Sequence, residues 1–142
     1  MTELFSVEDK VIVITGATGV LGRSMVRHFA REGAKIVLLG RDRKVGDEQV
    51  GEVEREGGSA IFLATDVTDK AVVERNHADI MRIYGRIDVL INGAGGNMPG
   101  ATIAPDQTLF DLDGEAMRRV VDLNLFGTVI PTLVFARAMV EQ

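Results

Sequence analysis

Apolar residues gather along this chain in four short runs that do not alternate with polar residues. The runs cover residues 10–15, 35–39, 60–64 and 87–91. Strands covered on both faces of a parallel sheet show this pattern, because every side chain then points into apolar surroundings. The pattern therefore predicts four buried parallel strands.

Helical stretches separate these runs, at about residues 20–32, 43–56 and 70–84, and a glycine follows each of them. In the first stretch, Leu21, Met25 and Phe29 recur at spacings of four, which predicts an apolar face directed toward the sheet. Strands and helices that alternate in this way form right-handed crossovers. We therefore expect an α/β fold of the Rossmann type, a doubly wound parallel sheet of order 3-2-1-4, in one domain over residues 1–142.

A long segment rich in Gly, Pro, Asn and Thr follows the fourth run, over residues 93–113. Loops of this length are functional or disordered, and this one lies beyond the carboxyl end of a strand, where ligands bind in such folds. We favour contact with substrate or cofactor over a simple insertion. A last helix is expected after Asp113, with a kink between Phe126 and Pro131, because proline removes a helical hydrogen bond.

Composition narrows the possible functions. The 142 residues include 16 basic and 21 acidic ones, a formal net charge of −5, and no stripe of Lys or Arg that would follow nucleic acid. The amino terminus lacks the pattern of a signal peptide, and the apolar runs are shorter than the roughly 18 residues of a membrane span. We expect a soluble cytoplasmic protein. With no cysteine and two isolated histidines, no metal site is expected.

The sequence VIVITGATGVLG, which ends at Gly22, joins an apolar strand to a helix through a glycine-rich turn. A phosphate group binds where backbone N–H groups and a helix amino terminus come close to it, which requires that side chains be absent. Gly16, Gly19 and Gly22 provide such a turn. We favour binding of a dinucleotide pyrophosphate over a purely structural turn.

Four motifs in this order resemble those of the short-chain dehydrogenase/reductase family. They are TGATGVLG from Thr15 to Gly22, Asp66-Val67 after the third run, Asn92-Gly93-Ala94-Gly95 after the fourth, and Asn124 in NLFGT. Two positions depart from the family pattern: Val20 stands where glycine is common, and Gly93 replaces the second asparagine of the usual NNAG.

The resemblance implies a role for each matching residue. Asn124 would be a catalytic residue that helps to hold a water in the proton relay. Asp66 would accept a hydrogen bond from the adenine amino group, with the Val67 backbone beside it, and Asn92 and Gly95 would lie on the ribose side and support the central strand. The full expected cofactor site consists of Gly16, Thr18, Gly19, Val20, Leu21, Gly22, Arg41, Asp66, Val67, Asn92, Gly93, Ala94 and Gly95.

The end of the second strand bears on the choice of cofactor. An acidic residue there would bind the adenosine ribose and repel a 2′-phosphate, but this chain has Gly40 followed by Arg41. Arginine pairs with phosphate, so we expect NADP(H) rather than NAD(H). Asp42 weakens this argument, and the alternative is that Arg41 is an ordinary solvated loop cation.

Other residues have simpler interpretations. Tyr84, the only tyrosine, lies on an apolar helix face and is expected to pack there. His77 is expected to be a hydrogen-bonded helix residue, and His28 to be exposed. Asp88 is expected to cap or orient the start of the fourth strand.

Hydride transfer in the family also requires a serine and a Tyr-x-x-x-Lys pair that follow the helix in which this chain ends. We expect the chain to be the amino-terminal, cofactor-binding half of an oxidoreductase that acts on a small carbonyl or alcohol and forms homo-oligomers. The alternative is a non-catalytic dinucleotide-binding or interaction module. The stretches from Ala94 to Thr102 and from Phe110 to Asp113 also resemble the family group labelled D-mannonate oxidoreductases.

Overall fold

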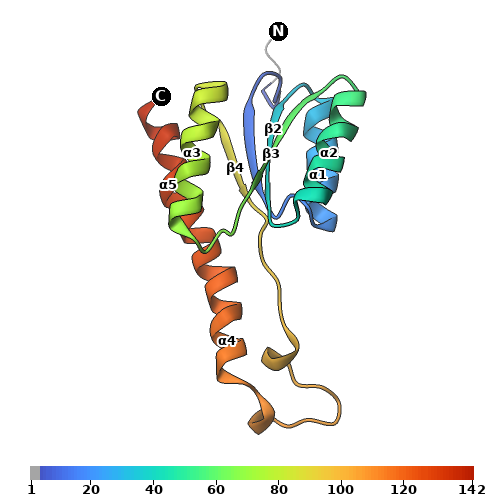
Figure 1. Cartoon of the computed structure of the whole chain (residues 1–142), viewed down its shortest axis with the longest axis vertical. Coiled ribbons are helices and arrows are strands. Elements are labelled where there is room, and N and C mark those ends of the chain that lie inside the picture. Colours follow the sequence, from blue (N-terminus) through green and yellow to red (C-terminus); the bar gives the residue numbers. More distant parts are fainter. Residues whose placement is uncertain (1–3) are drawn as a thin grey trace.

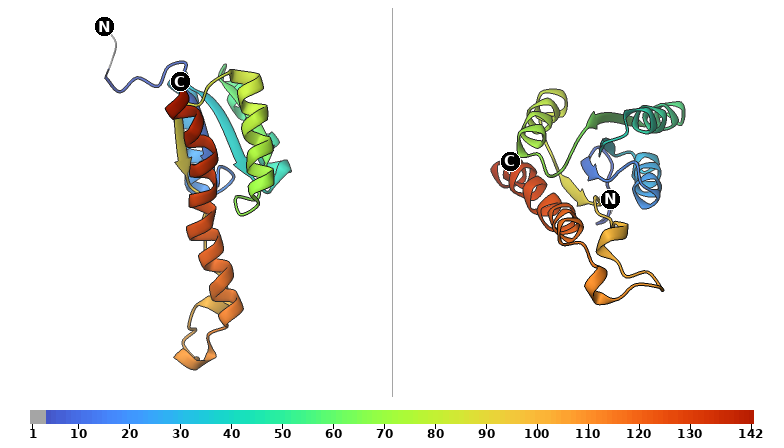
Figure 2. Two further views of the ribbon diagram at one scale, coloured as in Figure 1. Left: turned by 90° about the vertical axis from the view of Figure 1, so that its left-hand side faces the viewer. Right: turned by 60° about the horizontal axis from the view of Figure 1, so that its bottom comes forward.

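The computed structural model describes residues 4–142 as a four-stranded parallel sheet with two helices on each face (Figures 1 and 2). The strand order is β3-β2-β1-β4, which confirms the expected topology. Each strand lies within two residues of the run that predicted it. The bounds are Val11–Thr15 for β1, Lys35–Gly40 for β2, Ser59–Ala64 for β3 and Val89–Asn92 for β4.

Helices α1 (Val20–Arg31) and α2 (Arg43–Arg55) cover one face of the sheet, and α3 (Lys70–Tyr84) and α5 (Gly127–Glu141) cover the other (Figure 2). Successive β1 side chains point to opposite faces of the sheet. Ile12 and Ile14 pack with α1 and α2, whereas Val11 and Val13 pack with α3 and α5. Both sets are buried. The central strand is therefore apolar at every position except Thr15, as the run predicted.

Short polar side chains and glycines set the helix ends. Asp42 and Asp69 cap α2 and α3, because their carboxylates accept hydrogen bonds from the backbone amides of Val45 (3.0 Å) and Val72 (3.2 Å). Gly85 ends α3 with a φ of 72°, a left-handed conformation that glycine adopts without strain.

The face of α1 that meets the sheet is shifted by one residue from the expected one. Gly22, Val26 and Ala30 are buried, whereas Leu21 is 78% exposed. Gly22 lies against the turn, since a Cβ there would be 2.2 Å from the Gly16 carbonyl oxygen and 2.7 Å from the Ala17 Cα, and this close contact restricts the rotation of the helix. The prediction was therefore wrong for Leu21, while Met25 and Phe29 are partly buried beside the core.

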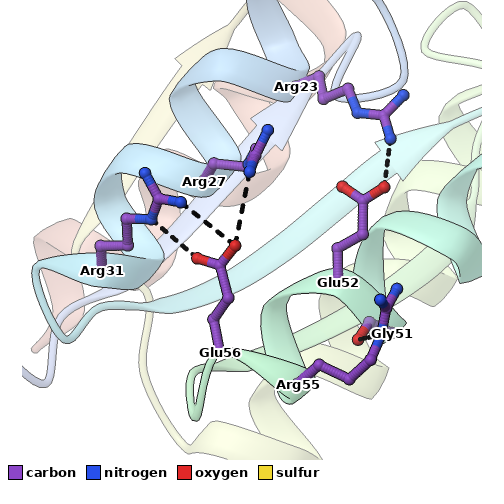
Figure 3. Close-up of polar contacts among 7 residues, drawn as sticks. All are labelled: Arg23, Arg27, Arg31, Gly51, Glu52, Arg55 and Glu56. Atoms are coloured by element: carbon purple, nitrogen blue, oxygen red, sulfur yellow. Dashed lines mark hydrogen bonds and ion pairs between the residues drawn. The ribbon is translucent and has the colours of Figure 1, made fainter.

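Ion pairs join α1 to α2 on the outer surface (Figure 3). Arg27 and Arg31 both contact Glu56, with Arg31 Nε 2.8 Å from Oε2, and Arg23 pairs with Glu52. The hydrogen bond from Arg31 is the main reason that the pKa of Glu56 lies below its usual value. These contacts link the helix after the glycine-rich turn to the helix after Arg41.

The last helical region is long and irregular. Helix α4 (Gly114–Val121) continues through a π-helical segment, Asp122–Phe126, into α5. The irregularity therefore precedes the expected position: Pro131 lies inside α5, and the extra residue of the π turn is accommodated around Asn124. Residues 96–121 extend well beyond the sheet (Figure 1).

Residues 114–141 form one helical stretch that is long and apolar enough to cross a membrane by length and composition alone. This is weak evidence, because core helices of soluble proteins pass the same test. In this chain Gly127, Pro131, Phe135 and Ala138 are buried, and Phe135 and Ala138 belong to the core on that face of the sheet.

Candidate functional site

A cleft of about 240 Å³ opens at the carboxyl ends of β1, β2, β3 and β4. This is the edge at which open α/β sheets bind ligands. Nine of the expected site residues line the cleft, from four separate loops that the fold brings together. They are Gly16, Thr18, Gly19, Arg41, Asp66, Val67, Gly93, Ala94 and Gly95.

The glycines of the turn are present for different reasons. A Cβ on Gly16, whose φ is +65°, would lie 2.5 Å from the carbonyl oxygen of Gly93, and a Cβ on Gly22 would lie 2.2 Å from that of Gly16. These two glycines are needed for the chain to fold. Gly19 has only one such neighbour, the Gly16 oxygen at 3.3 Å. The absence of a side chain at Gly19 therefore leaves open space in the cleft and is not needed for the backbone to pack.

The turn also presents free donors. Gly19 is the amino-terminal cap of α1 and makes no side-chain capping bond. The backbone amides of Val20, Leu21 and Gly22 have no hydrogen-bond partner among residues 4–142. Unpaired amides in a first helical turn carry partial positive charge and bind anions. The arrangement fits a pyrophosphate group, although Val20, Leu21 and Gly22 do not themselves line the cleft.

Thr15 connects this turn to the loop after β4. Its buried hydroxyl accepts hydrogen bonds from the backbone amides of Gly93 and Ala94, each 3.1 Å away. From the sequence, Thr15 is placed at the end of a strand and at the start of the TGATGVLG motif, but its hydroxyl is given no role. The signal was present, because a threonine that ends an apolar strand before a glycine has a hydroxyl that must find a partner.

Asp66 and Arg41 contribute opposite charges to the cleft. Asp66 Oδ1 accepts hydrogen bonds from the Thr68 hydroxyl (2.7 Å) and amide (2.9 Å), and with the nearby Arg41 these lower the pKa of Asp66. Its Oδ2 has no partner within residues 4–142, and Arg41 makes no ion pair there. One carboxylate oxygen and one guanidinium are therefore available to a ligand.

Asn92 and Asn124, two further expected site residues, do not line the cleft but support the segments around it. Asn92 Nδ2 donates to Thr132 Oγ1 (3.0 Å), which ties the end of β4 to α5. Asn124 lies in the π-helical segment, and its side chain binds the backbone of Gly96 and the carbonyl of Val120. Both asparagines thus support the loop after β4.

Several cleft residues were not identified from the sequence. Leu39, Gly40, Thr65 and Leu123 line it, and Thr65 is buried against α3. Gly40 was considered only as a replacement for an acidic residue. These residues reach the cleft because the sheet brings the ends of its strands together, which the sequence does not show.

The simpler interpretations have mixed outcomes. Tyr84 packs in the apolar core, His28 is exposed, and Asp88 joins the strand starts through a 2.9 Å hydrogen bond from the Val11 amide. The expectation for His77 was wrong, because its buried Nε2 has no hydrogen-bond partner in the described part of the chain and the ring instead packs near Phe135. Residues 4–142 contain no cluster of three or more potential metal ligands.

Comparisons with known proteins identify the family of this chain. The family model for short chain dehydrogenase matches residues 10–142. An uncharacterized oxidoreductase, UxuB of Bacillus subtilis (strain 168), is 36% identical over 140 residues, which cover 93% of this chain and 50% of that protein.

Solved structures give the same result. A protein from Haemophilus influenza assigned as a D-mannonate oxidoreductase, crystallised with bound NAD, superposes with a TM-score of 0.88 at 35% identity, over 94% of this chain and 51% of that one. An NAD⁺-bound xylitol dehydrogenase superposes with a TM-score of 0.86 at 29% identity, over 96% and 50%. The chain thus spans about half the length of the relatives it matches. It belongs to the short-chain dehydrogenase family.

Proposed function

We propose that this chain binds a nicotinamide adenine dinucleotide in the cleft at the carboxyl edge of the sheet. The observation that carries the proposal is the opening at Gly19, where a side chain is absent without a structural need and three unpaired amides follow. A pyrophosphate fits such a group of donors. Titrating the chain with NADPH or NADH and following the fluorescence of the reduced nicotinamide tests this directly.

The remaining residues divide along the dinucleotide. The free Oδ2 of Asp66 accepts a hydrogen bond from the adenine amino group, beside the Val67 backbone. Gly93, Ala94 and Gly95 line the cleft from the loop after β4 and would contact the bound cofactor from that side, and Thr18 would contact it from the turn. Asn92 and Asn124 act from behind this loop.

For the cofactor itself, NADP(H) is our choice over NAD(H). Arg41 supports it, because its unpaired guanidinium borders the cleft next to the carboxyl end of β2, and a 2′-phosphate would give it a charge-assisted partner. The two structural relatives that carry NAD favour the opposite choice. The role of Arg41 in the choice of cofactor therefore needs a direct test.

The test compares Arg41→Ala with Arg55→Ala, a matched arginine on α2 whose Nε donates to the Gly51 carbonyl away from the cleft (Figure 3). We expect Arg41→Ala to weaken NADPH binding by about tenfold, the value of one charge-assisted hydrogen bond, and to leave NADH binding unchanged. Arg55→Ala should change neither. Equal NADPH affinity in all three proteins would favour NAD(H).

The parent protein is proposed to be an oxidoreductase of which residues 1–142 form the dinucleotide-binding domain. When bound, the cofactor supplies or accepts the hydride. From this half, Asn124 would hold the loop at Gly96, and the family resemblance implies that it also helps to hold a water in the proton relay. The alternative is a dinucleotide-binding module without catalysis. A Ser and a Tyr-x-x-x-Lys encoded after Gln142 would support the enzyme, and a stop codon the module.

A sugar acid such as D-mannonate, or its oxidised partner D-fructuronate, is our proposed substrate. The likeness to the Haemophilus influenza protein supports it, together with the loop sequence after β4. The parent protein, assayed with both sugar acids and both nicotinamide cofactors, should show turnover with one pair. Turnover of neutral polyols alone would reject the assignment.

The parent is also proposed to be a cytoplasmic homo-oligomer. Apolar residues recur at every fourth position along α4, the π segment and α5, and Met117, Val121, Leu125, Val129 and Leu133 are each at least 38% exposed. An exposed apolar stripe of this length favours a protein partner. Light scattering of the parent should give a mass above that of one chain, and replacing Leu125 and Leu133 by Glu should reduce it.

A further inference from the structure

A buried polar pair lies below the adenosine end of the cleft. Asn76 on α3 is 7% exposed and Thr65 is 4% exposed. Asn76 Nδ2 donates to Thr65 Oγ1 at 2.7 Å and to the Ala64 carbonyl at 3.4 Å, and the Thr65 hydroxyl donates to the Leu63 carbonyl at 2.8 Å. A buried amide and hydroxyl are costly unless paired, so this arrangement has a preferred geometry.

The pair is connected to both loops that border this end of the cleft. The Thr65 backbone amide donates to the Gly40 carbonyl at 2.8 Å, and Gly40 is followed by Arg41. Thr65 itself is followed by Asp66. Asn76, Thr65 and Gly40 thus form a hydrogen-bonded line from α3 across the ends of β3 and β2. Thr65 and Gly40 line the cleft, whereas Asn76 does not.

We infer that Asn76 is a positioning residue for the adenosine site: through Thr65 it sets the separation between the Arg41 loop and the Asp66 loop. This inference rests on the proposed function. A leucine would fill the same buried position on α3 without needing a partner, but the Thr65 hydroxyl would then keep only its hydrogen bond to the Leu63 carbonyl and would lose its link to α3. The two loops would then sample wider separations, and a rigid ligand that spans them would bind more weakly.

The test uses the 142-residue chain and measures binding rather than turnover. The variants are Asn76→Leu, Thr65→Val, the double variant, and the conservative Thr65→Ser, which keeps the hydroxyl. The matched control is Gln49→Leu, which removes another buried amide, on α2, that has no hydrogen-bond partner within residues 4–142 and does not line the cleft. Each protein is titrated with NADPH, then with AMP in competition, and its melting temperature is recorded.

We expect Asn76→Leu to weaken AMP and NADPH binding by about fivefold, the size of one buried hydrogen bond. Thr65→Ser should bind as the original chain does, and Gln49→Leu should too. Because Asn76 acts through Thr65, adding Asn76→Leu to Thr65→Val should cause no further loss. A melting temperature well above that of the assay would show that each variant is folded while binding is measured.

AMP affinity within twofold of the original in both Asn76→Leu and Thr65→Val would overturn the inference and leave the proposed function standing. Additive losses in the double variant would also overturn it, since Asn76 would then act by another route. If the original chain binds neither NADPH nor NADH, the proposed function fails, and the inference fails with it. If Asn76→Leu does not fold, Thr65→Val against Thr65→Ser decides the same question.

Discussion

The side chain of Asn124 holds the backbone of Gly96 on both of its polar groups: Nδ2 donates to the Gly96 carbonyl at 2.6 Å, and Oδ1 accepts from the Gly96 amide at 3.2 Å. Nδ2 also donates to the Val120 carbonyl at 2.8 Å, one turn earlier in the same helical region. The π segment therefore presents its asparagine to the loop that leaves β4. The contact leaves little space at Gly95, where a Cβ would lie 2.8 Å from Oδ1.

Replacing this amide should loosen the loop. Asn124→Asp keeps the acceptor for Gly96 but loses both donated hydrogen bonds and turns a carboxylate oxygen toward two carbonyls. We expect a loss of about 1 kcal/mol in the free energy of unfolding, measured by urea denaturation, because the site is partly solvated. Thr128→Val, one turn later, is the matched control and should cost less. Equal losses would mean that the Gly96 contact is unimportant.

The glycines of the turn should separate folding from binding. Gly22→Ala places a Cβ 2.2 Å from the Gly16 carbonyl, against backbone that has no room to move, so we expect severe destabilisation, about 3 kcal/mol or more. Gly19→Ala meets only one atom at 3.3 Å and should remain folded while dinucleotide binding falls. Thermal unfolding and NADPH titration of both variants measure the two effects. Normal NADPH affinity in Gly19→Ala would contradict the proposed cleft.

Acid should weaken the start of β4 through Asp88. Burial alone would raise the pKa of this carboxylate, but hydrogen bonds from Arg86 (Nε at 2.9 Å) and from the Val11 amide lower it overall. A carboxylate whose pKa is lower in the folded state than in the unfolded state stabilises the fold at pH values above its unfolded-state pKa, near 3.8. This stabilisation is lost as the pH falls through the folded-state pKa.

Asp88→Asn should therefore be less stable than the original chain at pH 7, by about 1–2 kcal/mol, and the difference should shrink below pH ~4. Urea denaturation across this pH range measures it. Asp79→Asn removes an exposed ion pair with Arg82 and should change stability little at any pH. A difference for Asp88→Asn that is the same at pH 7 and pH 3 would exclude the carboxylate charge as its cause.

Gln49 provides a route to a more stable protein. It is 1% exposed, and neither Nε2 nor Oε1 has a hydrogen-bond partner among the described residues. Gln49→Leu removes the cost of an unpaired buried amide at similar volume, so we expect a gain of about 1–2 kcal/mol. Gln49→Glu should lose stability, since it would bury a charge. Chemical denaturation should show a higher free energy of unfolding for Gln49→Leu and a lower one for Gln49→Glu.

Much of the fold followed from patterns within single segments. The runs at β1 to β4 predicted a parallel sheet because apolar residues fill most of their positions without alternating with polar ones, and the position of Gly85 predicted the end of α3. The rotation of α1 was missed, because the spacing of Leu21, Met25 and Phe29 does not report where the helix touches the sheet. That contact is set by Gly22 against the turn, which lies in another element of the chain.

The sequence by itself determined the order of strands and helices and the residue types at the strand ends, since both depend on periodicity and on local chemistry. Tertiary structure alone decided which of those residues meet. Thr15 reaches Gly93 and Ala94, and Asn76 reaches Thr65, because neighbouring strands and the helices that cover them bring distant segments within hydrogen-bond distance. Side-chain hydrogen bonds between distant segments act over about 3 Å and have no fixed spacing in the sequence, so no periodic pattern along the chain predicts them.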